Sequence, residues 1–336
     1  MSLSVVYTRA AIGVKAPLIS VEVHLSNGLP GLTLVGLPET TVKEARDRVR
    51  SAIINSGYAF PAKKITINLA PADLPKEGGR YDLPIAIALL AASEQLNTPG
   101  LSSCEFVGEL ALTGALRGVP GAISGALEAI RAGRQIIVAN ENASEVSLIA
   151  EKGCLVAGHL QEVCAWLEGR HELAEPQEND EVAPDSPEDL SDIMGQEQGK
   201  RALEITAAGG HNLLLIGPPG TGKTMLASRL SGLLPPLNNH EALESAAIFS
   251  LVSSTSLHKQ WRRRPFRSPH HSASLTAMVG GGSIPGPGEI SLAHNGILFL
   301  DELPEFERRV LDALREPIES GEIHLSRTRA KISYPA

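Results

Sequence analysis

Residues 212–224 read NLLLIGPPGTGKT, and residues 225–230 continue with MLASRL. The apolar run 212–216 predicts a short buried strand, and residues 225–230 predict a helix. A strand, a glycine-rich loop and a helix in this order form the local structure that a phosphate-binding loop requires. The stretch therefore predicts an α/β domain in which residues 217–224 hold a nucleotide polyphosphate.

Each residue type in this loop has an expected role. The three glycines let backbone amides face the phosphates, and the helix N-terminus adds its dipole. Lys223 would reach the β- and γ-phosphates, and the hydroxyl of Thr224 would bind Mg²⁺. Average residue usage produces this pattern by chance in about 1% of chains of this size. The predicted nucleotide-binding residues are Gly217, Pro218, Pro219, Gly220, Thr221, Gly222, Lys223 and Thr224.

Residues 296–302 read GILFLDE and supply the carboxylates that such a loop needs. The four apolar residues predict a buried parallel strand, and ligands bind at the C-terminal ends of such strands. Asp301 would hold Mg²⁺ through its water shell, and Glu302 would polarise the attacking water as general base. A strand that ends in two solvated acids is the alternative, but the upstream loop favours catalysis. We expect an ATPase that uses ATP and Mg²⁺, with Glu302 and Lys223 as its catalytic residues.

The formal net charge of −8 is concentrated in one stretch. Ten acids and no lysine or arginine lie between His171 and Gly199, so taking these ten charges from the total leaves +2 for the rest. The stretch contains three prolines and too few apolar residues to offset the entropy of ordering. We expect a solvated linker at 169–189, with a partner-binding acidic motif as the alternative.

Residues 1–168 mix strands with helices and predict an α/β domain. The pattern predicts strands at 19–25, 64–69 and 135–138, and helices at 41–55 and 124–132. Three cysteines without metal-ligand spacing fit a reducing compartment. The longest apolar run, residues 83–92, is far too short to cross a membrane. We expect a soluble, cytoplasmic protein that has no membrane contact.

The loop and the acidic strand resemble those of the AAA+ ATPases. Residues 192–196, DIMGQ, are similar to the segment beside adenine in that family, which implies that Ile193 and Gly195 bind nucleotide. Residues 265–271, PFRSPHH, and 288–296, GEISLAHNG, resemble the magnesium-chelatase-like branch and, within it, the ComM/YifB competence proteins. This branch carries an insert in the second helix of its ATPase core, and the resemblance also implies a hexameric ring. The insert would fall at residues 273–292 here, with a turn rich in glycine and proline at 280–288.

Residues 318–335, IESGEIHLSRTRAKISYP, predict a β-hairpin with Ile323 and Leu325 on one face. In related ring ATPases the equivalent hairpin points into the central pore and touches DNA. The resemblance therefore implies DNA contacts by the cations at the turn, Arg327, Arg329 and Lys331. A solvated basic turn is the alternative. The roles of Arg267, His270 and His271 stay open, and contact with nucleotide across a subunit interface is one of them.

The first domain resembles the proteolytic domain of Lon, whose fold is like that of ribosomal protein S5 domain 2. The resemblance rests on residues 75–79 (PKEGG), 108–114 (GELALTG) and 131–138 (RAGRQIIV). Lon uses a serine–lysine dyad, but residues 77–92 contain no serine, and residues 119–125, where the lysine would stand, read VPGAISG. A nucleophile without its base has no route to covalent catalysis, so we expect the fold without the protease chemistry.

Arg80 and Asp82 lie near the lost dyad in the sequence. We expect both to be ordinary surface residues.

Three functions fit these motifs: a DNA-translocating AAA+ motor, an ATPase subunit that drives metal insertion, and an ATP-dependent protease. The missing dyad opposes the protease. A Lon-like domain ahead of the ATPase core is foreign to the chelatase motor subunit, so the motor is favoured. The ComM/YifB resemblance implies a hexameric helicase that promotes branch migration on single-stranded or branched DNA during natural transformation.

The expected domain at 190–336 stops before parts that the family needs for hydrolysis. The resemblance implies a γ-phosphate sensor, an arginine supplied to the neighbouring subunit and a helical lid beyond residue 336. We therefore expect this chain to be a fragment that binds nucleotide weakly and hydrolyses it poorly, because the neighbour's arginine stabilises the transition state.

Overall fold

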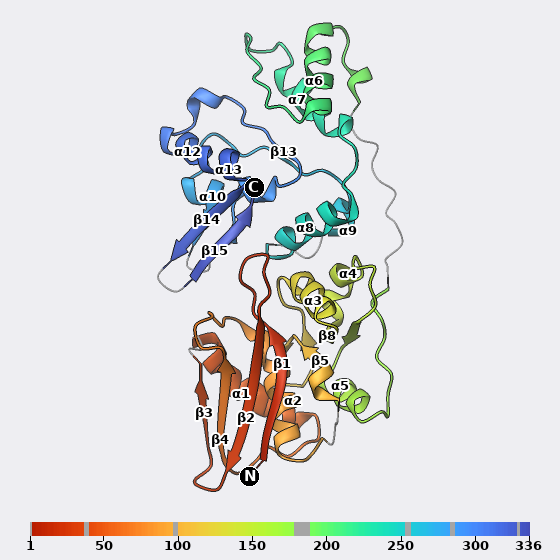
Figure 1. The fold of residues 1–336 in the computed structure, drawn as a ribbon, viewed down its shortest axis with the longest axis vertical. Coiled ribbons are helices and arrows are strands. Elements are labelled where there is room, and N and C mark those ends of the chain that lie inside the picture. The colour runs from red at the N-terminus through yellow and green to blue at the C-terminus, as the bar shows by residue number, and fades with distance from the viewer. Residues whose placement is uncertain are drawn as a thin grey trace. The chain divides into compact units, whose positions relative to one another are not determined.

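The computed structural model describes residues 2–36, 40–96, 100–177, 189–252, 257–282, 286–327 and 330–336. The chain divides into two compact units, which are formed mainly by residues 1–179 and by residues 180–336. Figure 1 shows the helices and strands of each. A large hydrophobic core lies in the first unit, and smaller apolar clusters are present among the described residues of the second. Together the units form a mixed α/β fold.

The first unit is built on a seven-stranded sheet in the order β3-β4-β2-β1-β5-β8-β9. Its central strands, β1 with β2 and β2 with β4, pair antiparallel, and the other four pairs are parallel. A separate pair, β6 and β7, lies outside this sheet. The strands are β1 (Ser2–Arg9), β2 (Leu18–Ser26), β3 (Gly31–Val35), β4 (Lys64–Ala70), β5 (Cys104–Phe106), β6 (Glu109–Leu110), β7 (Leu116–Arg117), β8 (Gln135–Ala139) and β9 (Cys154–Ala157).

The helices of the first unit are α1 (Thr40–Asn55), α2 (Asp82–Ala92), α3 (Ala122–Arg131), α4 (Ala143–Val146) and α5 (Leu160–Leu167). The three predicted strands and both predicted helices are confirmed, and their ends agree to within two residues. In β2 every second side chain is buried, as the alternation of 19–25 requires. Helix α3 ends just before Gly133, whose φ of 70° suits glycine.

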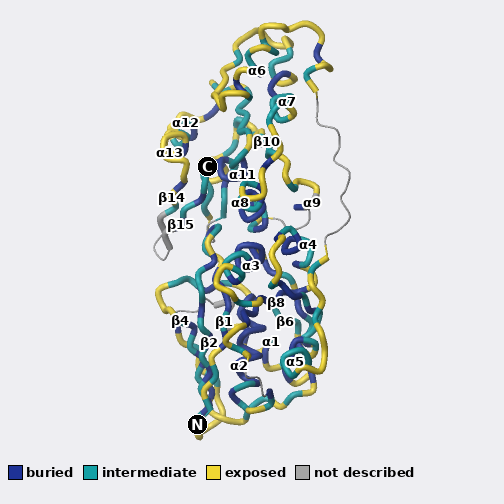
Figure 2. Tube along the Cα trace, turned by 45° about the vertical axis from the view of Figure 1, so that its right-hand side comes forward, coloured by how far each residue is buried: buried dark blue, intermediate teal, exposed yellow. Residues whose placement is uncertain are grey.

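Helix α2 is apolar on all sides because it is buried on all sides (Figure 2). It packs on β1 and β2 and against α1. Its apolar run is therefore a core helix, and Pro84 is tolerated because it lies in the first turn. None of the described helices is long and apolar enough to cross a membrane.

The expectation that Arg80 and Asp82 lie on the surface is wrong. Both side chains are buried, and each is held by polar partners distant in sequence. Asp82 accepts two hydrogen bonds from Arg48, at 2.8 and 3.2 Å, and one from the amide of Leu110. Arg80 donates to the carbonyl oxygens of Arg9 and Pro120. Burial costs a charge little only when such partners replace water.

Burial also shifts the pKa of two carboxyls in this unit. It raises the pKa of Asp82 to about 6, against the opposing effect of Arg48. It raises the pKa of Glu145 to about 7, although Oε1 accepts hydrogen bonds from Asn142 (2.8 Å) and the amide of Ala122 (3.1 Å). Glu145 thus binds the amide of Ala122, the first residue of α3, through a carboxyl group whose neutral form is favoured by burial.

The expected linker begins inside the first unit. Leu173 packs against the core, and the amide of Val156 donates to the carbonyl oxygen of Ala174 at 2.9 Å. Residues 178–188 lie outside the described residues.

Among the residues that the structure describes, the second unit contains strands of two to six residues and helices of four to 13 residues. Strands β10 and β13 pair parallel, β11 and β12 pair antiparallel, and β14 pairs with β15. The strands are β10 (Phe266–Arg267), β11 (Gly280–Gly281), β12 (Gly286–Pro287), β13 (Ile297–Leu298), β14 (Glu322–Arg327) and β15 (Ala330–Pro335). The helices are α6 (Glu197–Gly209), α7 (Lys223–Leu233), α8 (Asn239–Ser250), α9 (Leu257–Gln260), α10 (Leu275–Val279), α11 (Glu289–Leu292), α12 (Arg308–Ala313) and α13 (Arg315–Ser320).

The predicted strand 212–216 is wrong for this structure. The segment has no regular secondary structure, and the exposed fractions of Leu214 and Ile216 are 66% and 87%. No strand in the described parts of the chain pairs with it, so its backbone groups have no ladder to join. An apolar run satisfies a strand prediction locally, but a sheet partner decides whether the strand forms.

The predicted hairpin 318–335 is confirmed with a later start. Residues 318–320 belong to α13, which ends where Gly321 adopts a φ of 72°. Ile323, Ile332 and Tyr334 are buried, and Leu325 packs beside this small core. The apolar face of the hairpin therefore forms as the alternation of its residues predicts.

A Glu145→Gln substitution should flatten the pH dependence of the first unit's stability. The wild-type carboxyl has a folded pKa near 7 and an ordinary value of 4.5, so its contribution falls as pH rises from 4.5 to 7. Glutamine stays neutral throughout. We expect the difference in unfolding free energy between pH 5 and pH 8 to shrink by about 3 kcal/mol.

Urea unfolding followed by Trp166 fluorescence measures this, because Trp166 packs on the first core. A Trp261→Phe background removes the other tryptophan from the signal. Identical pH profiles for the wild type and the Glu145→Gln variant would contradict the assigned pKa.

Candidate nucleotide-binding site

The glycine loop is anchored to the second unit through helix α7. Gly220 and Gly222 have φ values of 76° and 83°, which let the chain turn sharply into the helix at Lys223. Leu226, one turn into α7, packs with Leu203 of α6 in a small buried cluster. The helix end therefore fixes the loop although most loop residues are exposed (Figure 2).

The loop encloses the ammonium group of its own lysine. Lys223 Nζ donates to the carbonyl oxygens of Gly217 and Pro218, both at 2.9 Å. Thr221 Oγ1 also donates to the carbonyl of Pro218 at 2.9 Å. A polyphosphate that enters the loop offers stronger, charged acceptors for the same ammonium. The predicted loop residues thus come together with a cation at their centre.

Thr224 and Asp301 meet although 77 positions separate them in the sequence. The hydroxyl of Thr224 donates to Asp301 Oδ2 at 2.9 Å, and the amide of Glu302 donates to Asp301 Oδ1 at 3.0 Å. A hydroxyl and a carboxylate are oxygen ligands of the kind that Mg²⁺ uses together with substrate phosphates and water. These two residues fit a nucleotide-bound Mg²⁺, and in the described residues no cluster of three metal-ligating side chains competes with them.

The parallel pair β10–β13 carries the two carboxylates to the loop. The amides of Ile297 and Phe299 donate to the carbonyls of Pro265 and Arg267, both at 2.8 Å. Strand β13 is shorter and less buried than the sequence predicts, since it covers two residues that are both half-buried. A Cβ on Gly296 would meet the carbonyl oxygen of Pro265 at 2.1 Å, so only glycine allows this approach.

Glu302 stands beside Asp301 in an unusual backbone conformation. Its φ of 54° is uncommon for a residue other than glycine, and its side chain is 65% exposed. Oε2 lies 3.2 Å from Nδ1 of His271. The carboxylate is accessible to solvent and lies next to Asp301, the candidate metal ligand, as a general base for water requires.

Arg267 is committed to an ion pair in this structure. Its Nε and Nη2 atoms donate to the two carboxylate oxygens of Glu289, both at 2.6 Å, and these bonds raise the pKa of Arg267. The rings of His270 and His271 lie 4.0 Å apart, and His270 Nδ1 lies 2.8 Å from Ser272 Oγ. Sequence reasoning missed Glu289 and the contact between His271 and Glu302, because neither pair is adjacent in sequence.

The segment expected to lie beside adenine contributes to the cluster under α7. Ile193 is buried with Leu203 and Leu226, whereas Gly195 is exposed with a φ of 71°. The exposed backbone around Gly195 is the part of this segment that the adenine of a nucleotide could contact. Contact of Ile193 and Gly195 with nucleotide stays a prediction.

The described residues of the expected insert, 273–292, include α10, the β11–β12 pair and α11. A Cβ on Gly288 would meet the carbonyl oxygen of Met278 and the amide nitrogen of Gly280 at 2.3 Å, so the two ends of the turn touch closely. The side chains of Arg327, Arg329 and Lys331 lie outside the described residues. Their contact with DNA also stays a prediction.

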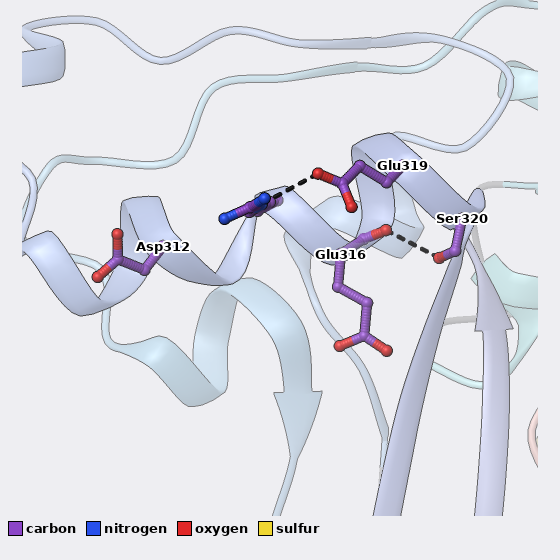
Figure 3. Close-up of a pocket in the computed structure, with 5 residues that line it drawn as sticks. Asp312, Glu316, Glu319 and Ser320 are labelled. Atoms are coloured by element: carbon purple, nitrogen blue, oxygen red, sulfur yellow. Dashed lines mark hydrogen bonds and ion pairs between the residues drawn. The ribbon is translucent and has the colours of Figure 1, made fainter.

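A shallow hollow on α12 and α13 is a poor place for nucleotide (Figure 3). Three carboxylates line it, and its one cation, Arg315, pairs with Glu319 at 3.0 Å. Such a surface repels a polyphosphate. The glycine loop, with its central lysine, is the better candidate.

Two family models match the chain. One, described as magnesium chelatase, subunit ChlI, matches residues 189–336, and the other, described as subunit ChlI of Mg-chelatase, matches residues 21–142. YifB of Salmonella typhimurium is 79% identical over 336 residues, which are all of this chain and 66% of the relative. Competence protein ComM of Haemophilus influenzae is 60% identical, over all of this chain and 67% of the relative.

The chain belongs to the ComM/YifB family of magnesium-chelatase-like proteins. Like its family, it is a ChlI-type AAA+ protein. It spans about two thirds of the length of the YifB and ComM relatives.

More distant relatives of this ComM/YifB chain match parts of it. The magnesium-chelatase 38 kDa subunit of Cereibacter sphaeroides is 30% identical over 170 residues, which are 45% of this chain and 50% of the relative. Lon protease 2 of Bacillus subtilis is 29% identical over 149 residues, which are 41% of this chain and 26% of the relative.

A Lys223→Ala substitution in this ComM/YifB chain should weaken ATP binding about 10–100-fold, because it removes a charged donor to the phosphates. Titration calorimetry with ATP and Mg²⁺ measures the effect. Lys200→Ala, which removes a lysine of α6 instead, should leave the affinity unchanged. Equal affinities of the Lys223→Ala variant and the wild type would place the phosphates elsewhere.

A Gly296→Ala substitution should separate β10 from β13 and lower stability by about 1–3 kcal/mol, the usual cost of overpacking. Gly286→Ala is the matched control, because a Cβ there meets nothing within 4 Å. Thermal unfolding of the two variants measures the difference. If both unfold at the wild-type temperature, the close approach of Gly296 to Pro265 is not a constraint.

Proposed function

We propose that this chain contains the nucleotide-binding core of an ATP-hydrolysing motor. The observation that carries the proposal is the 2.9 Å contact of Thr224 with Asp301, which joins the phosphate loop to the acidic strand. In the proposed reaction Lys223 binds the β- and γ-phosphates, and Thr224 and Asp301 hold Mg²⁺ against them. Glu302 accepts a proton from the water that attacks the γ-phosphate. The bound metal supplies charge stabilisation to the phosphoryl group.

We further propose that the intact protein moves DNA as a hexameric ring and promotes branch migration. Three observations support this. A relative of 60% identity is named a competence protein. The strands β14 and β15 pair as a hairpin. In the sequence, three cations stand within five positions where this hairpin turns. Cations at a hairpin tip bind phosphates without reading sequence, as a motor on single-stranded or branched DNA requires.

A metal-insertion ATPase is the second candidate. Both family models and the 38 kDa chelatase subunit favour it. The two candidates differ in their response to DNA. ATP turnover of the full-length protein should rise when single-stranded or four-way-junction DNA is added at low salt, and it should not rise with a porphyrin. The reverse response would favour the chelatase-like candidate.

A Glu302→Gln substitution should lower ATP turnover of the full-length protein at least about 100-fold and leave ATP affinity nearly unchanged, because it removes the base but keeps the shape. Phosphate release and nucleotide titration measure the two quantities. Glu305→Gln, three positions along the chain, serves as the control. Retained turnover in the Glu302→Gln variant would assign the base to another residue.

A further inference from the structure

Residue His271 lies in the segment between β10 and α10, at the edge of the paired strands where the carboxylates emerge. Strands β10 and β13 run parallel, so the residues that follow each strand reach the same edge. His271 follows β10 by four positions, and Glu302 follows β13 by four positions. The pairing of the strands thus brings the imidazole to the proposed general base.

The contact joins a partly buried imidazole to an exposed carboxylate. His271 Nδ1 lies 3.2 Å from Glu302 Oε2, and the His271 side chain is 34% exposed against 65% for Glu302. The ring of His270 lies 4.0 Å from that of His271. The strand before them is held by the Arg267–Glu289 ion pair and by the bond from the amide of Phe299 to the carbonyl of Arg267.

Stability alone is a weak reason for such a contact. An ion pair between exposed groups typically contributes about 0–1 kcal/mol. A glutamate that is 65% exposed has several rotamers open to it, and a general base must direct one oxygen at the proton it removes. A partner that holds one oxygen leaves the other for water and restricts the side chain to one orientation.

We propose that His271 is a positioning residue for Glu302. The imidazole holds Oε2 through Nδ1, and Oε1 is left to accept the proton of the attacking water. Each of the two carboxylates at the end of β13 then has its own polar partner. Thr224 of α7 fixes Asp301 for the metal, and His271 fixes Glu302 for water. This inference rests on the proposed ATPase function.

Three variants of the full-length protein test the proposal. His271→Ala removes the contact and should lower kcat about 10-fold with KM for ATP unchanged, since the lost group never touches nucleotide. His271→Asn should restore most of the loss, because its amide nitrogen is bonded to Cγ as Nδ1 is in histidine. His240→Ala, which removes an imidazole of α8 that is 76% exposed, is the matched control, and its kcat should stay close to that of the wild type.

Steady-state ATP turnover gives kcat and KM, and circular dichroism confirms that each variant is folded. A kcat of the His271→Ala variant equal to or above the wild-type value would overturn the proposal, and so would an equal loss in the His271→Asn variant. A raised KM with unchanged kcat would mean that His271 binds nucleotide instead. Absence of turnover in the wild type would overturn the ATPase function and, with it, this inference.

Discussion

The parallel pairing of β10 with β13 is the constraint on which the candidate site depends. It involves two residues on each side, and Gly296 permits it by leaving room for the carbonyl of Pro265. From it follow the position of Asp301 beside Thr224 and that of Glu302 beside His271. The phosphate loop contributes its lysine from a helix end that packs on α6. The chemistry of the site is thus divided between a helix N-terminus and the ends of two strands, as in other α/β nucleotide folds.

In the first unit, buried polar contacts connect the segments in which the sequence resemblance would place the Lon dyad. Arg80 follows the PKEGG turn and donates to the carbonyl oxygen of Pro120, inside the segment where the lysine would stand. Glu145 binds the amide of Ala122 in the same segment. A buried pair, Arg9 with Glu105 at 2.6 and 2.8 Å, lies nearby in the core of the sheet. Removing one partner of such a pair leaves an uncompensated buried charge, so these groups stabilise the fold of the first unit.

Sequence patterns predict those parts of the structure that are determined by residues close together in the chain. The alternation of 19–25, the glycine at 133 and the spacing of the loop 217–224 are local signals, and the structure follows them. Patterns fail where distant residues decide. The run 212–216 is apolar but has no partner strand in the described structure. The burial of Arg80 and Asp82 is compensated by hydrogen bonds with Pro120 and Arg48, which are distant in sequence. The link from His271 to Glu302 likewise depends on strand pairing, which no spacing rule reveals.

The central claim is that Thr224 and Asp301 form a Mg²⁺ site on bound ATP. Binding of Mn²⁺ with a non-hydrolysable ATP analogue, followed by electron paramagnetic resonance, tests it most directly. An Asp301→Asn substitution should weaken metal binding in the ternary complex about 10-fold or more and leave metal-free nucleotide affinity unchanged, because carboxylates that hold a metal directly or through a ligand contribute on this scale. An unchanged Mn²⁺ affinity would contradict the account, because the acidic strand would then have no part in holding the metal.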